Sequence, residues 1–389
     1  MKGTPPLFKI SALSVLTIFL SCGQNKNDRN VTIENVNGVT YVRNPEQGLW
    51  DSGGKAKIRL VQEIQIGKLD GQEEYLFVYI SDVAVNGKGD IYVADRQLNE
   101  VRKFDREGRY LLTIGRKGQG PGEFQSISTI SVNKQNDLFI FDNMLGRISI
   151  FSDRGEHKET SKKLLAGSWI EPRKIFFQNK DFVFFGKANQ GLNLFHVFNE
   201  KWDETDSYIE YEPSDDKEFE EHNLGFFPGN CFVQDNGDLL YTKYYYDNQV
   251  RAYRNRKLAK IMTRKSSIKK PYEIQVFHDV NKAMSIPRDQ DYDFKSFGKG
   301  IAFIGKSFQN SLGVFQLPDG HIVNFLSIRI SKSLRVLWVE LFDSTGKLMS
   351  YSKLGDNLNY DIRCMDSGGR FYAIERKEYN KVVTFRLEY

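Results

Sequence analysis

The stretch Asp82-Val-Ala-Val-Asn-Gly-Lys-Gly89-Asp-Ile-Tyr-Val-Ala-Asp95 contains an apolar run, a glycine-rich polar turn and a second run that carries an aromatic residue. A third alternating run, Val101-Arg-Lys-Phe104, and a second turn, Asp105-Arg-Glu-Gly108, follow it. Two β-patterned runs joined by a short turn of this kind predict a β-hairpin. Because the same unit recurs along the chain, the repeat decides the fold.

The turn before the aromatic strand occurs in six copies. They are Gly89-Asp-Ile-Tyr-Val, Asn136-Asp-Leu-Phe-Ile, Lys180-Asp-Phe-Val-Phe, Gly237-Asp-Leu-Leu-Tyr, Gly320-His-Ile-Val-Asn and Gly369-Arg-Phe-Tyr-Ala. A third strand follows each hairpin, and several units continue through a second turn into a fourth strand. Four strands in each unit, repeated roughly every 40–50 residues, are typical of β-propeller blades. The sequence therefore predicts an all-β, six-bladed β-propeller with four-stranded antiparallel blades.

The last unit lacks a fourth strand before the chain reaches Tyr389. A β-patterned run at Ile58-Arg-Leu-Val-Gln-Glu-Ile-Gln-Ile66 can supply it. Pairing an N-terminal strand with three C-terminal strands closes the ring and removes an open sheet edge, which would favour association with other chains. We therefore predict a propeller over residues 58–389, closed by its N-terminal strand, and we expect a monomer.

One interval between copies is much longer than the others, and it predicts an insertion near 265–300. Within it, Val276, Phe277, Val280, Ala283 and Met284 follow helical spacing behind Pro271. We predict a short amphipathic helix packed against the edge of the ring. Such an insertion either caps the channel or decorates the surface.

Residues 1–21 have the pattern of an export signal, because Lys2 and Lys9 precede an apolar run from Ile10 to Leu20. A run this short fits the apolar region of a signal peptide and not a membrane-spanning helix. The junction Phe19-Leu-Ser-Cys22 resembles a bacterial lipobox, which implies a lipid on Cys22 and a membrane as partner. The alternative is an ordinary cleaved leader with an incidental cysteine. Residues 22–57 then form a polar tether and lead-in, and Gly23 favours delivery to the outer membrane.

The charge balance argues against a nucleic-acid partner. The chain has 55 Lys and Arg against 50 Asp and Glu, a formal charge of +5. Nucleic-acid binding calls for a strongly basic face. The high aromatic content, with 29 Phe and 19 Tyr, favours strands instead.

Three segments together carry a resemblance to a known repeat. They are Gly115-Arg-Lys-Gly-Gln-Gly-Pro-Gly-Glu-Phe124, Ile91-Tyr-Val-Ala-Asp95 and Asn99-Glu-Val-Arg-Lys-Phe-Asp105. They resemble the NHL-type repeat, and with the leader the chain is similar to six-bladed β-propeller lipoproteins of bacterial cell envelopes. The resemblance implies the fold and an envelope location, with a periplasmic or surface-facing domain. It implies no reaction.

Propeller sites form where the first strands of the blades begin, because every blade contributes residues to one channel mouth. Taken blade by blade, these positions are Asp82, Thr129, Arg173, Asn230, Ser311 and Asp361, with Arg363 close by. We take Asp82, Arg173, Asn230, Asp361 and Arg363 as binding candidates. Related calcium-dependent lactonases carry carboxylates and Asn here, as a hard cation requires, but the two arginines would repel Ca²⁺. A small polar or anionic ligand, or a purely structural polar ring, are the other interpretations.

No other constellation predicts catalysis. The five histidines are scattered over the repeats, so they do not suggest a zinc site, and the chain has no Gly-x-Ser-x-Gly elbow. Cys231 and Cys364 occupy similar places in separate units, too far apart for a disulfide. We predict no cofactor, no catalytic residue and a binding or scaffolding role towards a protein, peptide or glycan. The alternative is a metal-dependent, lactonase-like hydrolase or lyase with its site in the channel.

Overall fold

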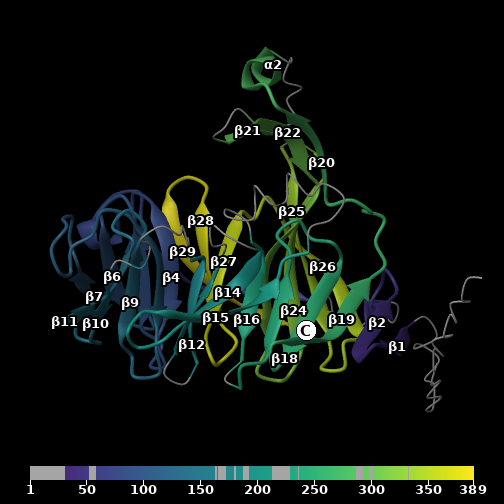
Figure 1. Ribbon diagram of the computed structural model, residues 1–389, viewed down its shortest axis with the longest axis horizontal. Helices are drawn as coiled ribbons and strands as arrows, with labels where there is room; N and C mark the ends of the chain where they lie inside the picture. Colours follow the sequence, from purple (N-terminus) through teal and green to yellow (C-terminus); the bar gives the residue numbers. More distant parts are fainter. Residues whose placement is uncertain are drawn as a thin grey trace, which may run out of the picture.

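The computed structural model describes residues 31–51, 58–162, 164, 172–178, 181–186, 192–212, 228–234, 236–285, 293–297, 301–331 and 333–389. Within these residues, six antiparallel blades form a ring, as predicted. Figure 1 shows the blades from the side. The predicted leader, residues 1–21, and Cys22 lie outside the described part of the chain. Within that part, no helix has the length and apolar character needed to cross a bilayer.

Blades 1 to 5 each contain four strands that are consecutive in the chain. Blade 1 contains β4 (Ile80–Val85), β5 (Ile91–Asp95), β6 (Glu100–Phe104) and β7 (Tyr110–Ile114), and a short 3₁₀ helix, η2 (Glu73–Tyr75), precedes it. Blade 2 contains β8 (Ile127–Val132), β9 (Leu138–Asp142), β10 (Arg147–Phe151) and β11 (His157–Thr160). Blade 3 contains β12 (Lys174–Gln178), β13 (Asp181–Phe185), β14 (Asn193–Phe198) and β15 (Glu204–Glu210). Blade 4 contains β16 (Asn230–Val233), β17 (Leu239–Thr242), β18 (Gln249–Arg254) and β19 (Lys257–Arg264). Blade 5 contains β23 (Gln309–Gln316), β24 (Ile322–Arg329), β25 (Arg335–Phe342) and β26 (Leu348–Asp356).

Blade 6 closes the ring as the sequence predicts. It contains β27 (Tyr360–Met365), β28 (Phe371–Arg376) and β29 (Asn380–Glu388), and its fourth strand is β3 (Arg59–Ile66). β29 and β3 pair antiparallel, from Val382 opposite Ile66 to Glu388 opposite Arg59. The two ends of the ring thus share one blade, and neither leaves an unpaired edge there.

The repeated turn has a physical cause in the backbone. Gly89, Gly237, Gly320 and Gly369 have φ angles of 89°, 85°, 89° and 79°, and Asn136 has a φ of 65°. Glycine and asparagine are the residues that adopt this left-handed conformation readily. The turn therefore recurs with Gly or Asn at one position, and this made the repeat visible. The copy at Lys180 lies outside the described residues.

The apolar core lies between neighbouring blades. One cluster, for example, joins Ile374 and Val382 of blade 6 to Ile80, Val93 and Phe104 of blade 1. Neighbouring blades pack against one another through buried clusters of this kind around the ring.

The lead-in differs from the prediction. Within residues 22–57, predicted as a tether, β1 (Thr32–Val36) and β2 (Val39–Asn44) form a hairpin. β2 pairs in parallel with β19 and extends blade 4 to six strands. The buried Asn44 side chain donates to the carbonyls of Thr263 and Gly346 and accepts from Leu348 N–H, so it ties the hairpin to blades 4 and 5.

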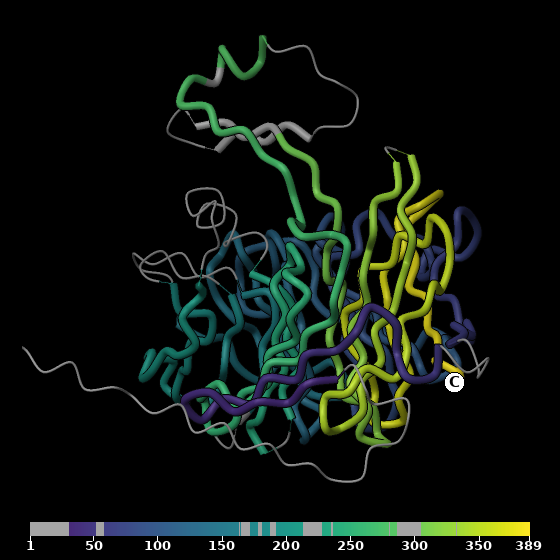
Figure 2. Tube along the Cα trace, turned by 90° about the vertical axis from the view of Figure 1, so that its right-hand side faces the viewer, coloured from purple at the N-terminus to yellow at the C-terminus, as the bar shows by residue number. Residues whose placement is uncertain are grey.

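The insertion also differs, because it is built mainly of strands. β20 (Tyr272–Phe277), β22 (Ile301–Ser307) and β21 (Asp293–Phe297) form a three-stranded sheet, which we call the arm. The predicted helix exists only as α2 (Val280–Ser285), and it lies at the far end of the arm and not against the ring (Figures 1 and 2). Val276 and Phe277, assigned to that helix from their spacing, belong to β20. Tyr272, Ile274 and Val276 alternate along it, and this period of two favours a strand.

Candidate functional site: the mouth of the channel

The first strands of the six blades surround the channel. β4 packs against β8 and β27, β8 against β12, and β16 and β27 against β23. Asp82, Thr129 and Arg363 lie at or beside β-bulges in β4, β8 and β27, where the register of pairing shifts. A bulge turns a side chain out of the regular alternation of a strand. The sequence-predicted positions therefore do converge on one end of the channel, which we call the mouth.

Asp82 joins blade 1 to its two neighbours. Its Oδ2 accepts hydrogen bonds from Thr129 Oγ1 at 2.6 Å and from Ile130 N at 2.9 Å, both in blade 2. Its Oδ1 lies 3.9 Å from Arg363 Nη1 of blade 6. Burial raises the pKa of Asp82, and the Arg363 charge and these hydrogen bonds oppose the rise.

Asp361 lies in a cluster of arginines. Its Oδ2 is 2.5 Å from Arg363 Nη2 and 3.2 Å from Arg376 Nη1. Burial would raise the pKa of Asp361, but the charges of Arg363, Arg376 and Arg173 outweigh it and hold the pKa below its usual range. Arg376 Nη2 also donates to the carbonyl of Ile80 at 2.7 Å, so it connects blade 6 to blade 1.

Asn230 and Ser311 connect blades 4 and 5 at the mouth. Asn230 Nδ2 donates to the Ser311 carbonyl at 2.9 Å. The Ser311 hydroxyl is 2.9 Å from Thr242 Oγ1 and donates to Asn324 Oδ1 at 2.9 Å. A small cavity of about 70 Å³ opens beside them. It is lined by Arg173, Lys174, Phe185, Pro228, Gly229, Asn230, Tyr244, Ser311, Leu312, Asp361, Ile362 and Arg363.

A second, larger cavity of about 200 Å³ lies within the channel. All six first strands contribute to it, and Lys174 and Arg363 line both cavities. Cys231 and Cys364 line it too and are free thiols, as predicted. Burial raises the pKa of each thiol to about 12, so neither is a thiolate at physiological pH.

The arm stands beside the mouth. It leaves the ring after β19 and returns at β23, the first strand of blade 5. Tyr244 lines the mouth cavity, and its neighbour Tyr245 packs against Tyr272 of β20 with ring centroids 4.9 Å apart. Figure 2 shows the arm projecting from this face of the ring.

Sequence reasoning missed two charged residues of this site. Lys174 lies next to the candidate Arg173, and its contribution to the deeper cavity follows only from the three-dimensional ring. The repeat alignment could have identified Arg376, because Glu375-Arg376 aligns with Asp95-Arg96 of blade 1. Arg96 reaches the Ile127 carbonyl of the following blade, just as Arg376 reaches that of Ile80.

The residues at the mouth do not fit a calcium site. Ca²⁺ requires six to eight oxygen ligands with a net negative charge. The carboxylates of Asp82 and Asp361 both face Arg363, and the Asn230 amide is used on Ser311. Among the described residues, no group of three or more His, Cys, Asp or Glu is placed to hold a metal ion.

A family model described as a 6-bladed beta-propeller, DUF5128, matches residues 55–293, which is more than half of the chain. The chain belongs to the DUF5128 family. No curated protein sequence matches it.

Solved structures resemble this DUF5128 propeller in fold. A DUF4221 family member from Bacteroides vulgatus is 11% identical with a TM-score of 0.57, covering 85% of this chain and 98% of that chain. A putative exported protein from Bacteroides fragilis is 12% identical with a TM-score of 0.53, covering 90% and 100%. A gluconolactonase from Xanthomonas campestris is 9% identical with a TM-score of 0.44, covering 80% and 87%. Identities this low support the propeller architecture alone, and the last score is too low to carry an argument.

Proposed function

We propose that this DUF5128 propeller is a binding or scaffolding module of the bacterial cell envelope. It is held to the membrane, most simply the outer membrane, through a lipid on Cys22. Its channel mouth receives a polar group of a protein, peptide or glycan partner. It performs no reaction of its own.

One observation supports this proposal above the others. All six blades contribute polar or charged groups to the mouth, and among the described residues the cations there outnumber the carboxylates. Two carboxylates, Asp82 and Asp361, face three guanidinium groups, those of Arg173, Arg363 and Arg376. A concave site with an excess of one charge and a few converging polar groups is the usual form of a ligand site.

The position of the arm also supports the assignment of the mouth as the binding face. Insertions in repeat proteins commonly lie on the binding face. Because the arm rises next to Tyr244, a partner bound at the mouth would also meet β20 and β22. A partner with an acidic group would match the surplus of positive charge.

Crosslinking in native envelopes tests the proposal. A tagged wild-type chain is expected to capture a stoichiometric partner after purification under denaturing conditions. Arg173→Ala is expected to lower the captured amount by about tenfold, on the scale of one charged hydrogen bond. Arg106→Ala removes an exposed arginine from the turn between β6 and β7, at the other end of blade 1, and serves as the matched control. Capture of no partner, or equal loss in both variants, would count against the proposal.

The calcium-dependent hydrolase or lyase is the competing hypothesis, and metal analysis separates the two. The binding module predicts no stoichiometric calcium in protein purified without chelators. One tightly held calcium ion per chain, lost on Asp82→Ala or Asn230→Ala, would favour the enzyme instead.

A further inference from the structure

The channel cavity contains a lysine with few partners. Lys174 Nζ has one hydrogen bond among the described residues, a 3.4 Å contact to the Cys231 carbonyl. It also lies 5.5 Å from the centroid of the Phe315 ring. A lysine ammonium has three donors. No carboxylate of the described chain lies within 4 Å of it, whereas Lys88 and Lys158 each have one and Lys103 has two.

Arg363 brings a second incompletely satisfied cation to the same cavity. Its Nη2 is bound to Asp361 and its Nη1 approaches Asp82 only at 3.9 Å. The buried Nε of Arg363 has no hydrogen-bond partner within the part of the chain that the structure describes. Buried donors without partners are uncommon in folded proteins and call for an explanation, such as an unseen ligand or water.

The remaining groups of the cavity do not neutralise these charges. Cys231 and Cys364 are neutral thiols. Among the described residues that line the cavity, Asp82 is the one carboxylate, and Thr129 and Ile130 already occupy its Oδ2. An incompletely paired cation in a confined space costs free energy until an anion or water completes its coordination.

We propose that Lys174 and Arg363 bind the carboxylate of a ligand inside the channel cavity. The inference rests on the proposed function, because it names the chemical group that the mouth admits. Lys174 and Arg363 line both cavities, so an acidic group that enters at the mouth reaches them directly. A cavity of about 200 Å³ is smaller than a typical whole-ligand pocket. It therefore takes the acidic end of a larger peptide or glycan, or a small carboxylic acid.

The charge count favours a carboxylate over a phosphate. Arg363 shares its charge with Asp361 and Asp82, so the cavity offers little more than the one full charge of Lys174. A monoanion balances this charge, whereas a phosphate dianion would be repelled by Asp82. Neutral sugars would leave the ammonium uncompensated.

Thermal unfolding of the full propeller with sodium acetate as the probe tests this site. Sodium chloride at equal ionic strength is the reference, and inorganic phosphate is the second arm. Acetate is expected to raise the melting temperature in a saturable way. Lys174→Met is expected to weaken the apparent affinity at least tenfold, as loss of one charge-assisted contact predicts. Lys257→Met, at the start of β19, is expected to respond to acetate as the wild type does.

Two further results keep the inference falsifiable. Lys174→Met is expected to fold without acetate, because methionine retains the apolar stem and removes an uncompensated charge. If Lys174→Met does not fold, Lys174→Arg replaces it in the test. Lys174→Arg keeps the charge, so it is expected to keep at least a third of the acetate affinity. Equal acetate responses in the wild type and Lys174→Met, or a response to phosphate and none to acetate, would overturn the carboxylate site. Mouth binding, which crosslinking tests, would then still stand. Loss of crosslinking with an intact acetate response would refute only the proposed function.

Discussion

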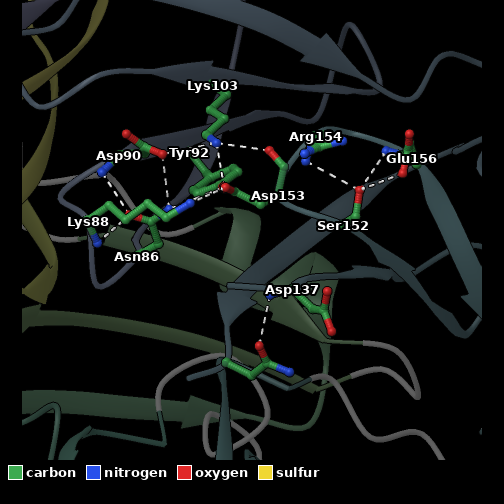
Figure 3. A network of polar contacts seen from close by, with 11 residues as sticks. Asn86, Lys88, Asp90, Tyr92, Lys103, Asp137, Ser152, Asp153, Arg154 and Glu156 are labelled. Atoms are coloured by element: carbon green, nitrogen blue, oxygen red, sulfur yellow. Dashed lines mark hydrogen bonds and ion pairs between the residues drawn. The ribbon is translucent and has the colours of Figure 1, made fainter. Parts of the chain in front are cut away.

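At two junctions between blades, a carboxylate accepts hydrogen bonds from side chains of the neighbouring blade, but the two carboxylates differ in exposure. Between blades 1 and 2, Asp153 accepts from Lys103 at 2.5 Å, Lys88 at 2.6 Å and Tyr92 at 3.0 Å (Figure 3). Between blades 4 and 5, Glu340 accepts from Arg264 at 2.7 Å, Tyr246 at 2.6 Å and Asn324 at 3.0 Å. Asp153 also accepts a longer hydrogen bond from Asn86 Nδ2 at 3.5 Å. The two junctions differ in exposure, because the Arg264 and Glu340 side chains are 2% and 0% exposed, against 6% and 27% for Lys103 and Asp153.

The difference follows from what surrounds each junction. Blades 1 and 2 are regular repeats, and their network lies at a turn that solvent reaches. Blade 4 carries the N-terminal hairpin on its outer edge, and β2 covers β19 beside Arg264. Arg264 lies opposite Asn44 of β2, and its guanidinium also lies over the Tyr351 ring, 3.7 Å from the ring centroid. Burial makes the loss of one partner more costly, because the other charge is then left without compensation.

Glu340→Ala is expected to have the largest effect on stability. It leaves the Arg264 guanidinium buried and removes the acceptor of Tyr246, so the free energy of unfolding should fall by about 3–5 kcal/mol. Urea denaturation followed by tryptophan fluorescence measures the change. The double variant Arg264→Met/Glu340→Leu is the control and should recover most of the loss, since neither charge remains. If the single variant loses less than about 1 kcal/mol, the buried pair does not stabilise this junction.

Asp153→Ala is expected to have a smaller effect. Lys103 would lose its main partner, but Asp90 remains 3.0 Å from Lys103 Nζ and solvent reaches the site. We expect a loss of about 1–2 kcal/mol by the same urea assay. A loss equal to that of Glu340→Ala would show that burial does not set the difference between the junctions.

The exposed junction should also respond to acid. Burial alone would raise the pKa of Asp153, but hydrogen bonds from Lys103, Lys88 and Tyr92 lower it to about 2. A depressed folded-state pKa contributes stability that is complete above the unfolded value of 3.8 and is lost as pH falls towards 2. The wild type should therefore lose more stability between pH 5 and 2 than Asp153→Asn. Asp70→Asn, in an exposed loop, should follow the wild type; parallel curves for all three proteins would contradict the assignment.

The fold was predictable because one backbone constraint recurs. The left-handed turn at Gly89, Asn136, Gly237, Gly320 and Gly369 restricts the residue type, so it leaves a mark in the sequence. The closing strand was predictable too, since the last unit was one strand short. The N-terminal hairpin was missed although Asn37-Gly38, with φ angles of 52° and 84°, is a strong hairpin signal between alternating residues. It was interpreted as tether because it belongs to no repeat.

The site was predictable only in part, for a related reason. Asp82, Asn230 and Asp361 follow from the rule that first strands begin at the mouth. Arg363 was also among the candidates, although it lies at a bulge where the regular alternation of the strand is interrupted. Lys174 requires knowledge of which side chains line the channel beyond that first layer, and Arg376 ends a second strand, which the rule does not consider. Their assignment as binding residues remains a prediction.

The smallest expected difference concerns the glycine turns at these two junctions. Gly155 of blade 2 packs on β7 of blade 1, and Gly346 of blade 5 packs on β19 of blade 4, with φ angles of 81° and 99°. A Cβ would lie 3.1 Å from Leu112 Cδ1 at Gly155, but 2.7 Å from Met262 Cγ at Gly346. Alanine is strained at both, by about 1–2 kcal/mol from the backbone alone. Gly346→Ala should therefore cost up to about 1 kcal/mol more than Gly155→Ala, because the contact is closer and its neighbours are held by the hairpin.

Paired urea titrations measure this difference. Gly320→Ala, where the added Cβ meets nothing within 4 Å, isolates the backbone contribution. If all three variants lose the same free energy, the packing of these turns does not distinguish the two junctions.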